Sequence, residues 1–343
     1  MIIESTFKPA WWLRNPHLQT LWPQISRYHA KLKMRKERLE LRDGDFLDLV
    51  WAGEGKGPIV IVLHGLGGSI KSPYATGAMK AIVDTGCRAV LMHFRGSSGE
   101  PNRHQRFYDA SDTADLQEFV LSLMRKEPGT PLAAIGFSLG GNVLLKWLGE
   151  TRQFNPLKAA VAVSVPFVIE KSLNRVRKGF SRVYHKLILQ QLRDEVISKF
   201  ETSEKSPINL DEFKQVNDIH DFNRLFVVPV HGYICPEDYY QRASCRQYLR
   251  YIEVPTLIIH AEDDPFMSSD VIPNEDELSP FVTLEIAKHG GHVGFVSGST
   301  MGKPEYWLEH RIPQFLRPIL EDAYAEVSAQ KQQTAGVLVT DTY

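Results

Sequence analysis

The chain has 343 residues, 43% hydrophobic and 24% charged, a composition that excludes a disordered protein and allows a sizeable buried core. Its 40 Lys and Arg residues balance 41 Asp and Glu residues, and the net charge of -1 creates no overall field that would attract nucleic acid. No apolar run approaches the roughly 18 residues of a membrane span. We therefore expect neither a nucleic-acid partner nor a transmembrane anchor.

The cysteines and the N-terminus indicate the compartment. Cys87, Cys235 and Cys245 form no C-x-x-C pair, and their odd number argues against a disulfide framework. The N-terminus lacks the basic segment and apolar core of a secretory signal. These features predict a protein of the reducing cytoplasm.

Alternating and continuous apolar runs predict the sheet. Residues 38–51 alternate apolar and polar side chains on both sides of Asp43-Gly44, which is typical of an antiparallel hairpin. Five later segments carry short continuous apolar runs: 58–65, 88–96, 131–140, 159–166 and 255–264. Helical periodicity appears between them, as in 72–86 and 111–127. This order predicts an α/β fold with a mainly parallel sheet covered by helices on both faces.

One interval, 167–250, interrupts the alternation of strands and helices because it contains no clear buried strand. Within it, 170–192 places a set of apolar residues on one face of a helix: Leu173, Val176, Phe180, Val183, Leu187 and Ile188. We interpret the interval as a helical cap inserted over the carboxyl edge of the sheet. The polar face of this helix carries Lys171, Arg175, Arg177, Lys178, Arg182 and Lys186, which suit either an anionic headgroup or, more simply, solvent.

These patterns predict the organisation of the chain. The predicted parts are an N-terminal extension (1–35), a core (36–166 and 251–328), a helical cap insertion (167–250) and a C-terminal tail (329–343). Internal repeats are absent from the sequence.

The run Gly136-Phe137-Ser138-Leu139-Gly140 follows an apolar strand pattern and precedes a helical one. A serine hydroxyl needs an exposed position and an adjacent base before it can act as a nucleophile. A sharp strand-to-helix turn provides that exposure, and glycines two residues before and after the serine let strand and helix approach. Ser138 is therefore the candidate nucleophile, with a simple tight turn as the alternative.

A second glycine-rich turn, 63–69, follows the strand pattern of 58–65. Backbone N–H groups at such a turn can stabilise the negative oxygen formed during acyl transfer. The N–H groups of Leu66 and Leu139 are the candidate oxyanion hole. The alternatives are a plain strand-to-helix turn and a phosphate loop, although the G-K-[ST] ending of a phosphate loop is missing.

Candidate acids and bases follow the last two strand patterns. Asp263 and Asp264 come after 255–262, and His289 and His292 lie in a glycine-rich loop. Taken singly, each histidine is an ordinary surface residue, and the paired acids are either part of a solvated turn or a metal site. The order Ser, Asp, His at successive strand ends favours a catalytic triad instead.

At these residues the sequence resembles the α/β-hydrolase superfamily, and closely its YheT-like family of hydrolases and carboxylesterases. The similarity covers nearly the whole chain through motifs that include NPHLQTLWP, HGLGGSIKSPYA, GFSLGGN, PTLIIHAEDDPFM and HGGHVGF. It implies an α/β-hydrolase fold, with Asp264 as the triad acid and His292 as the base. Asp263 and His289 are the runners-up.

The resemblance and the motifs together predict a serine hydrolase that cleaves short- to medium-chain carboxylic esters through an acyl-enzyme. Alternatives are an alcohol acyltransferase or thioesterase with the same triad, and a catalytically silent binding protein on the same fold. The expected partner is a small-molecule ester with an apolar acyl chain. We expect no cofactor and no metal, and the oligomeric state stays open.

Two further groups admit two interpretations. The N-terminal residues Trp11, Trp12, Leu18, Leu21 and Trp22 either line an acyl pocket or, more simply, pack in the core. Arg95 either binds a substrate carboxylate or fixes the loop that follows its strand.

Overall fold

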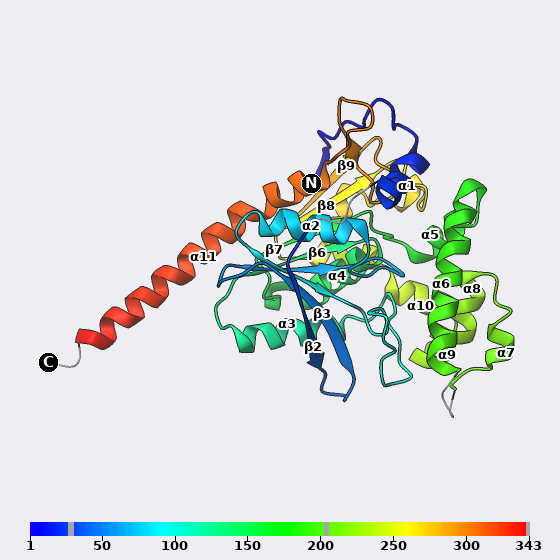
Figure 1. Cartoon of the computed structure of the whole chain (residues 1–343), viewed down its shortest axis with the longest axis horizontal. Coiled ribbons are helices and arrows are strands. Elements are labelled where there is room, and N and C mark those ends of the chain that lie inside the picture. The colour runs from blue at the N-terminus through cyan, green and yellow to red at the C-terminus, as the bar shows by residue number, and fades with distance from the viewer. Residues whose placement is uncertain (27–30, 202–205, 341–343) are drawn as a thin grey trace.

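The computed structural model describes residues 1–26, 31–201 and 206–340, which form a nine-stranded sheet in the order β1-β9-β8-β7-β6-β4-β5-β3-β2 (Figure 1). The strands are β1 (Ile2–Glu4), β2 (Met34–Glu40), β3 (Phe46–Ala52), β4 (Ile59–Leu63), β5 (Arg88–Met92), β6 (Leu132–Phe137), β7 (Ala159–Val163), β8 (Thr256–Ala261) and β9 (Val282–Ala287). Strands β10 (Val296–Ser297) and β11 (Glu305–Tyr306) form a separate two-stranded sheet.

The sheet is mainly parallel. Strands β1 and β4 to β9 pair with one another in parallel, while β2 and β3 form an antiparallel hairpin at the edge and β3 joins β5 in an antiparallel pair. The hairpin turn lies at Asp43-Gly44, as predicted, and Gly44 adopts the left-handed φ of 88° that glycine tolerates. Every residue of β4 to β8 is buried, which explains the continuous apolar runs of these strands.

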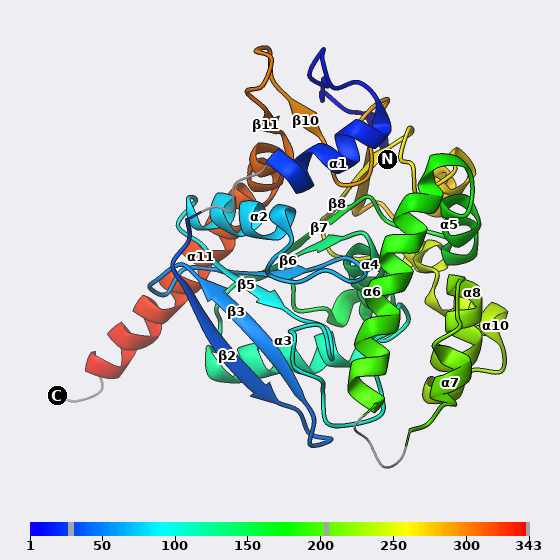
Figure 2. The same ribbon diagram turned by 45° about the vertical axis from the view of Figure 1, so that its right-hand side comes forward.

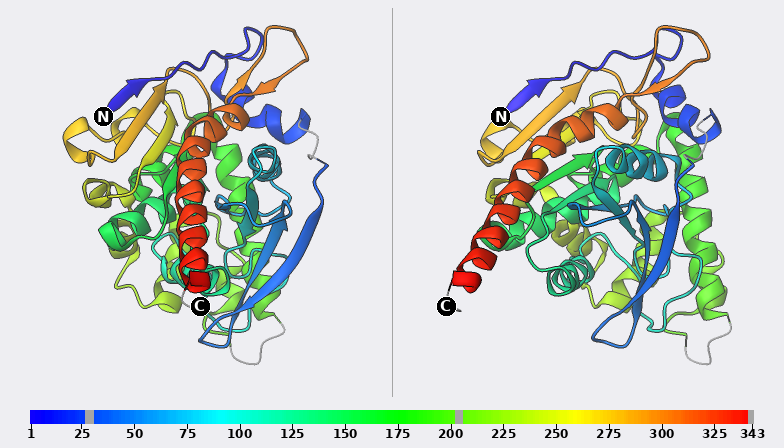
Figure 3. Two further views of the ribbon diagram at one scale, coloured as in Figure 1. Left: turned by 90° about the vertical axis from the view of Figure 1, so that its left-hand side faces the viewer. Right: turned by 60° about the vertical axis from the view of Figure 1, so that its left-hand side comes forward.

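Helices cover both faces of the sheet, which confirms the predicted fold class. On one face, Val60 and Val62 pack with α2 (Pro73–Val83) and α11 (Leu308–Thr340), which crosses the molecule in red in Figure 3. On the other, Ile59 and Ile61 pack with α3 (Ala114–Lys126) and α4 (Leu139–Thr151).

The segment after β7 is helical and forms a group at one side of the sheet (Figure 2). Its helices are α5 (Ile169–Val176), α6 (Arg182–Phe200), α7 (Leu210–Phe213), α8 (Ile219–Phe222), α9 (Val228–His231) and α10 (Pro236–Ala243). Short helical turns connect several of them, among them the single turn Gly179–Ser181 before α6. The last helix leads directly towards β8, so the whole group is an insertion between two neighbouring parallel strands.

The prediction of one continuous helix over 170–192 is wrong. The helix ends at Val176 and a new one begins at Arg182, because Gly179 adopts a left-handed φ of 56° that a helix cannot contain. The break changes which side chains face inward. Tyr184, Leu189 and Leu192 are buried, whereas the expected members Phe180, Val183 and Leu187 are exposed.

The C-terminus also differs from the prediction. Residues 329–340, predicted to form a separate C-terminal tail, instead continue α11 to Thr340, since their Ala, Gln and Lys residues favour a helix. Residues 341–343 lie outside the described part. Across the described ranges, no helix combines the length and the apolar character needed to cross a bilayer.

Candidate active site

Ser138 lies in a sharp turn between β6 and α4. Its backbone has φ 51° and ψ -116°, a conformation that L residues rarely adopt. The flanking glycines permit this turn: a Cβ on Gly136 would lie 2.5 Å from the carbonyl oxygen of Gly140. A Cβ on Gly140 would lie 2.5 Å from the carbonyl oxygen of His64. The turn therefore lifts Ser138 out of the sheet while α4 packs closely beneath it.

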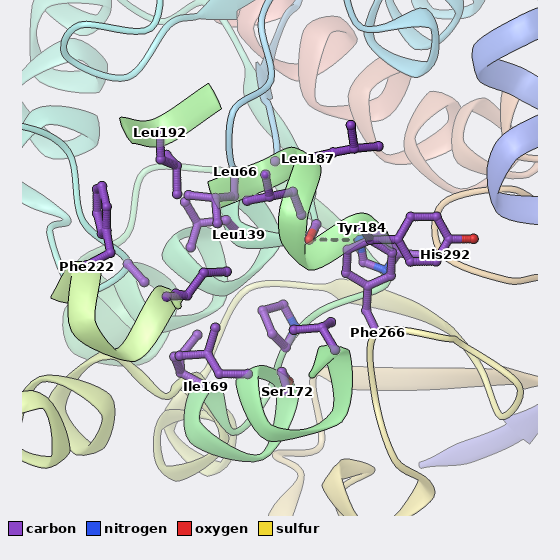
Figure 4. Close-up of a pocket in the computed structure, with 18 of the residues that line it drawn as sticks. Leu66, Leu139, Ile169, Ser172, Tyr184, Leu187, Leu192, Phe222, Phe266 and His292 are labelled. Carbon is purple, nitrogen blue, oxygen red and sulfur yellow. Dashed lines mark hydrogen bonds between the residues drawn. The ribbon is translucent and has the colours of Figure 1, made fainter. Parts of the chain in front are cut away.

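The structure brings three predicted site residues together. Nε2 of His292 lies 3.0 Å from Oγ of Ser138, and Nδ1 of His292 lies 2.8 Å from Oδ2 of Asp264. The second carboxylate oxygen of Asp264 accepts a hydrogen bond of 2.8 Å from the N–H of Phe266. The Phe266 ring stacks on the imidazole at 4.0 Å between ring centres (Figure 4). The side chain of Asp264 is 1% exposed, so its charge lies in a shielded position beneath the imidazole.

The runners-up form a separate pair. Oδ2 of Asp263 lies 3.1 Å from Nδ1 of His289, and Oδ1 accepts a hydrogen bond from the N–H of Gly291. Burial raises the pKa of the Asp263 carboxyl above its usual value. His289 is half exposed and does not reach Ser138. This pair holds the loop that carries His292.

The backbone N–H groups of Leu66 and Leu139 sit beside this arrangement, in the two glycine-rich turns. Within 1–26, 31–201 and 206–340, neither N–H donates a hydrogen bond to another protein group. Both residues also line the cavity that Ser138 faces (Figure 4). An unused donor pair beside a serine is what stabilisation of an oxyanion requires.

Neighbouring buried groups fix the conformation of the turn that carries Leu66. The N–H of Gly65 donates to the hydroxyl of Tyr74 at 2.9 Å, and the N–H of Gly67 donates to the hydroxyl of Tyr108 at 3.1 Å. These hydrogen bonds use the N–H groups on either side of Leu66 and leave its own N–H unpaired.

His64, which sequence reasoning missed, supports the same turn. Its Nδ1 lies 2.7 Å from the carbonyl oxygen of Gly65, and its Nε2 accepts a hydrogen bond of 3.2 Å from the N–H of Phe94. Burial lowers the pKa of His64 to about 3, although the hydrogen bond to Gly65 opposes this shift. The ring is therefore neutral, with one nitrogen donating and the other accepting.

Helix α1 (Pro16–Ser26) positions the histidine loop from outside the sheet. The N–H of His292 donates to Oγ1 of Thr20 at 2.9 Å, and this hydroxyl donates to the carbonyl oxygen of Pro16 at 2.8 Å. A Cβ on Gly294 would lie 2.3 Å from the carbonyl oxygen of Gln19, so only glycine fits this approach. Thr20 is the last residue of the NPHLQT motif, but the sequence alone did not predict its contact with His292.

Ser138 and His292 open into an apolar cavity of about 420 Å³ beneath the inserted helices (Figure 4). Its walls come from α5, α6, α8 and the segment that follows α8. Typical wall residues are Ile169, Leu173, Leu192, Phe222, Phe226 and Phe266. The mainly apolar walls suit an apolar chain, and a few polar side chains, among them Asp109, Ser172 and Asn223, interrupt them.

The two groups that sequence analysis left open can now be placed. Trp12 and Trp22 pack edge to face at 5.0 Å with Ala10, Leu13 and Val296, away from the cavity, as the core-packing interpretation holds. From the same set, Leu21 lines the cavity, whereas Trp11 and Leu18 are exposed.

Arg95 is buried in ion pairs within the protein and is not part of the cavity lining. It pairs with Asp115 at 2.7 Å, with Asp43 at 2.8 Å and with Asp45 at 3.0 Å. Its guanidinium therefore fixes the loop after β5 to the hairpin turn. Elsewhere in the described ranges, no three His, Cys, Asp or Glu side chains gather as they would around a metal ion.

Comparisons with known proteins agree with this architecture. Residues 58–299 match the family model described as alpha/beta hydrolase fold. The chain is 44% identical over 322 residues to "Putative esterase YheT" of Escherichia coli, covering 92% of this chain and 94% of that protein. It is 28% identical to "Phospholipase ABHD3" of Mus musculus, covering 94% and 81% of the two chains.

A solved structure shares the fold at lower identity. The Pyrococcus furiosus esterase Pf2001 superimposes with a TM-score of 0.57 at 18% identity, over 84% of this chain and 92% of that one. Together with the family match and the extended similarity to YheT, this shows that the chain belongs to the α/β-hydrolase fold family, in its YheT-like branch.

Proposed function

We propose that the chain is a serine hydrolase that cleaves carboxylic esters with short- to medium-chain acyl groups through an acyl-enzyme. The observation that carries the proposal is the continuous relay from Asp264 through His292 to Ser138, with distances of 2.8 and 3.0 Å, at the mouth of an apolar cavity. The names of its relatives, an esterase and a phospholipase, support an ester substrate.

In the proposed first step, the hydroxyl of Ser138 attacks the ester carbonyl and its proton passes to Nε2 of His292. The carboxylate of Asp264 keeps the Nδ1–H tautomer and stabilises the imidazolium. The imidazolium then gives its proton to the leaving alcohol as the carbon–oxygen bond breaks. Water, deprotonated by His292, hydrolyses the resulting acyl-serine and restores the hydroxyl.

The unpaired N–H groups of Leu66 and Leu139 are the proposed oxyanion hole. A negative oxygen forms in both tetrahedral intermediates, and preorganised donors in a water-poor site stabilise it most strongly. Loss of one such donor typically costs about a hundredfold or more in kcat. In this account, His64, Tyr74 and Tyr108 are positioning residues for Leu66.

The inserted helices of 167–250 are the proposed cap, and the acyl chain occupies the cavity between the cap and Ser138. Transfer of the acyl chain from water into the apolar cavity stabilises the bound state by about 0.8 kcal/mol per buried methylene. Cys87, Cys235 and Cys245 are free thiols, which supports placement in a reducing compartment, the cytoplasm.

Hydrolysis of p-nitrophenyl esters from acetate to dodecanoate tests the proposal. The native chain should hydrolyse them with a chain-length optimum, and Ser138→Ala or His292→Ala should lower kcat by at least about a thousandfold. Ser328→Ala, on the exposed side of α11, is the matched control and should retain native rates. Near-native turnover by Ser138→Ala would overturn the proposal.

A further inference from the structure

Helices α1 and α6, which are far apart in sequence but neighbours in space (Figure 2), both contribute residues to the lining of the cavity. Nδ1 of His17 lies 3.2 Å from the hydroxyl of Tyr184, and the His17 ring packs against Phe180 at 4.7 Å between centres. Leu21 from α1 and Leu187 from α6 both line the cavity, and because Leu187 is 59% exposed the cavity reaches the surface between these helices. These contacts fix the two helices side by side at the entrance.

The outer surface of this entrance is apolar. Its exposed side chains, with their exposed fractions, are Leu18 (49%), Ile25 (82%), Phe180 (51%), Val183 (45%) and Leu187 (59%). We call this set the apolar rim. Val183 and Leu187 are one helical turn apart, as are Leu18 and the cavity residue Leu21, so each helix presents a stripe. Because Leu187 belongs both to the rim and to the cavity wall, an apolar surface joins the rim to the cavity, beside the polar side chain of Gln24 on α1.

Positive charge lies beside the rim on the side of α5 and α6. The sequence has no Asp or Glu between residues 5 and 36, nor between residues 171 and 193. Asp270 pairs with Lys171 at 2.6 Å, and Asp218 pairs with Arg177 at 2.8 Å. Of the remaining cations, Lys178, Arg182 and Lys186 are exposed next to the rim, whereas Arg175 is partly buried and donates a hydrogen bond to Oγ of Ser181. Within the described part of the chain, no carboxylate forms an ion pair with the three exposed cations.

We propose that the apolar rim and these three cations dock the protein on the surface of an anionic lipid aggregate. Exposed apolar side chains gain free energy by entering the boundary between headgroups and acyl chains, and neighbouring Lys and Arg side chains bind anionic headgroups. The entrance of the cavity then faces the lipid, so an acyl chain passes from the aggregate towards Ser138 without crossing water.

The charge pattern favours lipid over a second copy of this chain. A symmetric dimer through this face would bring Lys178, Arg182 and Lys186 opposite the same cations of its partner. Like charges at close approach repel, whereas an anionic lipid surface attracts all of them at once. The idea that docking supplies substrate to Ser138 rests on the proposed esterase activity, whereas the docking on lipid does not.

Co-sedimentation with vesicles tests docking without turnover. We expect the native chain to bind vesicles of phosphatidylcholine with about a third phosphatidylglycerol, and to bind pure phosphatidylcholine at least about tenfold more weakly. The double variant Val183→Gln, Leu187→Gln should lower binding to the anionic vesicles by about tenfold or more. The triple variant Lys178→Gln, Arg182→Gln, Lys186→Gln should reduce it to the level of pure phosphatidylcholine and remove its salt dependence.

Matched controls lie at the opposite edge of the sheet. Phe154→Gln removes an even more exposed apolar side chain in the helical turn that follows α4. The triple variant Lys56→Gln, Arg125→Gln, Lys158→Gln removes the same number of exposed cations. Both controls should bind as the native chain does. The proposal is overturned if the native chain binds neither vesicle, if the controls lose as much binding as the rim variants, or if the rim variants abolish a dimer and leave vesicle binding unchanged.

Discussion

The backbone N–H of His292 donates a hydrogen bond of 2.9 Å to the hydroxyl of Thr20, a residue 272 positions earlier in the chain. This contact joins the N-terminal helix to the loop that carries the proposed base. The imidazole also stacks on Phe266 and pairs with Asp264, so it is held from the N-terminus, from the loop after β8 and from its own loop. Correct placement of the base thus depends on a segment outside the parallel sheet.

Replacing Thr20 should therefore impair turnover through the position of His292. Thr20→Val leaves the N–H of His292 without its acceptor, and we expect kcat on p-nitrophenyl butyrate to fall about tenfold with little change in KM. Thr20→Ser retains the hydroxyl and should keep nearly native kcat. Equal losses in the two variants would show that packing, not the hydrogen bond, is what matters at this position.

The two adjacent acids should differ sharply in their effect on the reaction. Asp264→Asn presents an amide to Nδ1 of His292, which favours the wrong tautomer, and kcat should fall by about 10³- to 10⁴-fold. Asp263→Asn is the matched control, because Asp263 contacts His289 and Gly291 instead. It should lower kcat by less than about tenfold. The reverse ranking in steady-state assays would mean that the triad acid is misassigned.

The size of the cavity should set the acyl-chain preference. Leu173→Trp adds bulk to a cavity wall, so kcat/KM for the longest accepted esters should fall by about 10- to 100-fold while acetate hydrolysis stays near native. Leu210→Trp enlarges a partly buried leucine of α7 outside the cavity lining and is the control. A uniform loss across all chain lengths would contradict this role of the cavity.

His64 should make the fold sensitive to acid. Its pKa is about 3 in the folded chain, mainly through burial, and about 6.5 when unfolded, so between these values the unfolded chain binds one more proton. Acid then favours unfolding, and this group lowers the free energy of unfolding by about 1.4 kcal/mol for each pH unit below 6.5.

Urea unfolding at several pH values between about 7 and 4 measures this effect. His64→Asn retains a donor near the carbonyl of Gly65 but has no titrating ring. The variant should be less stable at neutral pH and should show a shallower decline in acid. Parallel pH profiles for the two proteins would show that His64 is not held neutral.

The sequence was sufficient to predict the alternation of strands and helices along the core and the turns that carry Ser138, Asp264 and His292, but not β1 or the order of the strands across the sheet. Each of these features is local: a continuous apolar run, a glycine pair, a polar residue after a strand. The comparisons confirm the α/β-hydrolase fold that this alternation predicted. The catalytic roles of the residues stay predictions.

Features that depend on long-range packing were not predictable in the same way. The partnership of Thr20 with His292, and of His64 with Gly65 and Phe94, arises only after distant segments meet. The break at Gly179 shifted the helical phase, so that Phe180 and its neighbours face outward. Periodicity alone reports that a face is apolar, but not what that face contacts.

The most direct test of the central claim is the intact mass of the protein after exposure to a fluorophosphonate. This probe reacts covalently with an activated serine, and we expect a single adduct on the native chain, mapped to Ser138 and absent from Ser138→Ala. The Ser328→Ala control should be labelled as fully as the native chain. An unmodified native chain, or an adduct that persists in Ser138→Ala, would contradict the assignment of Ser138 as the nucleophile.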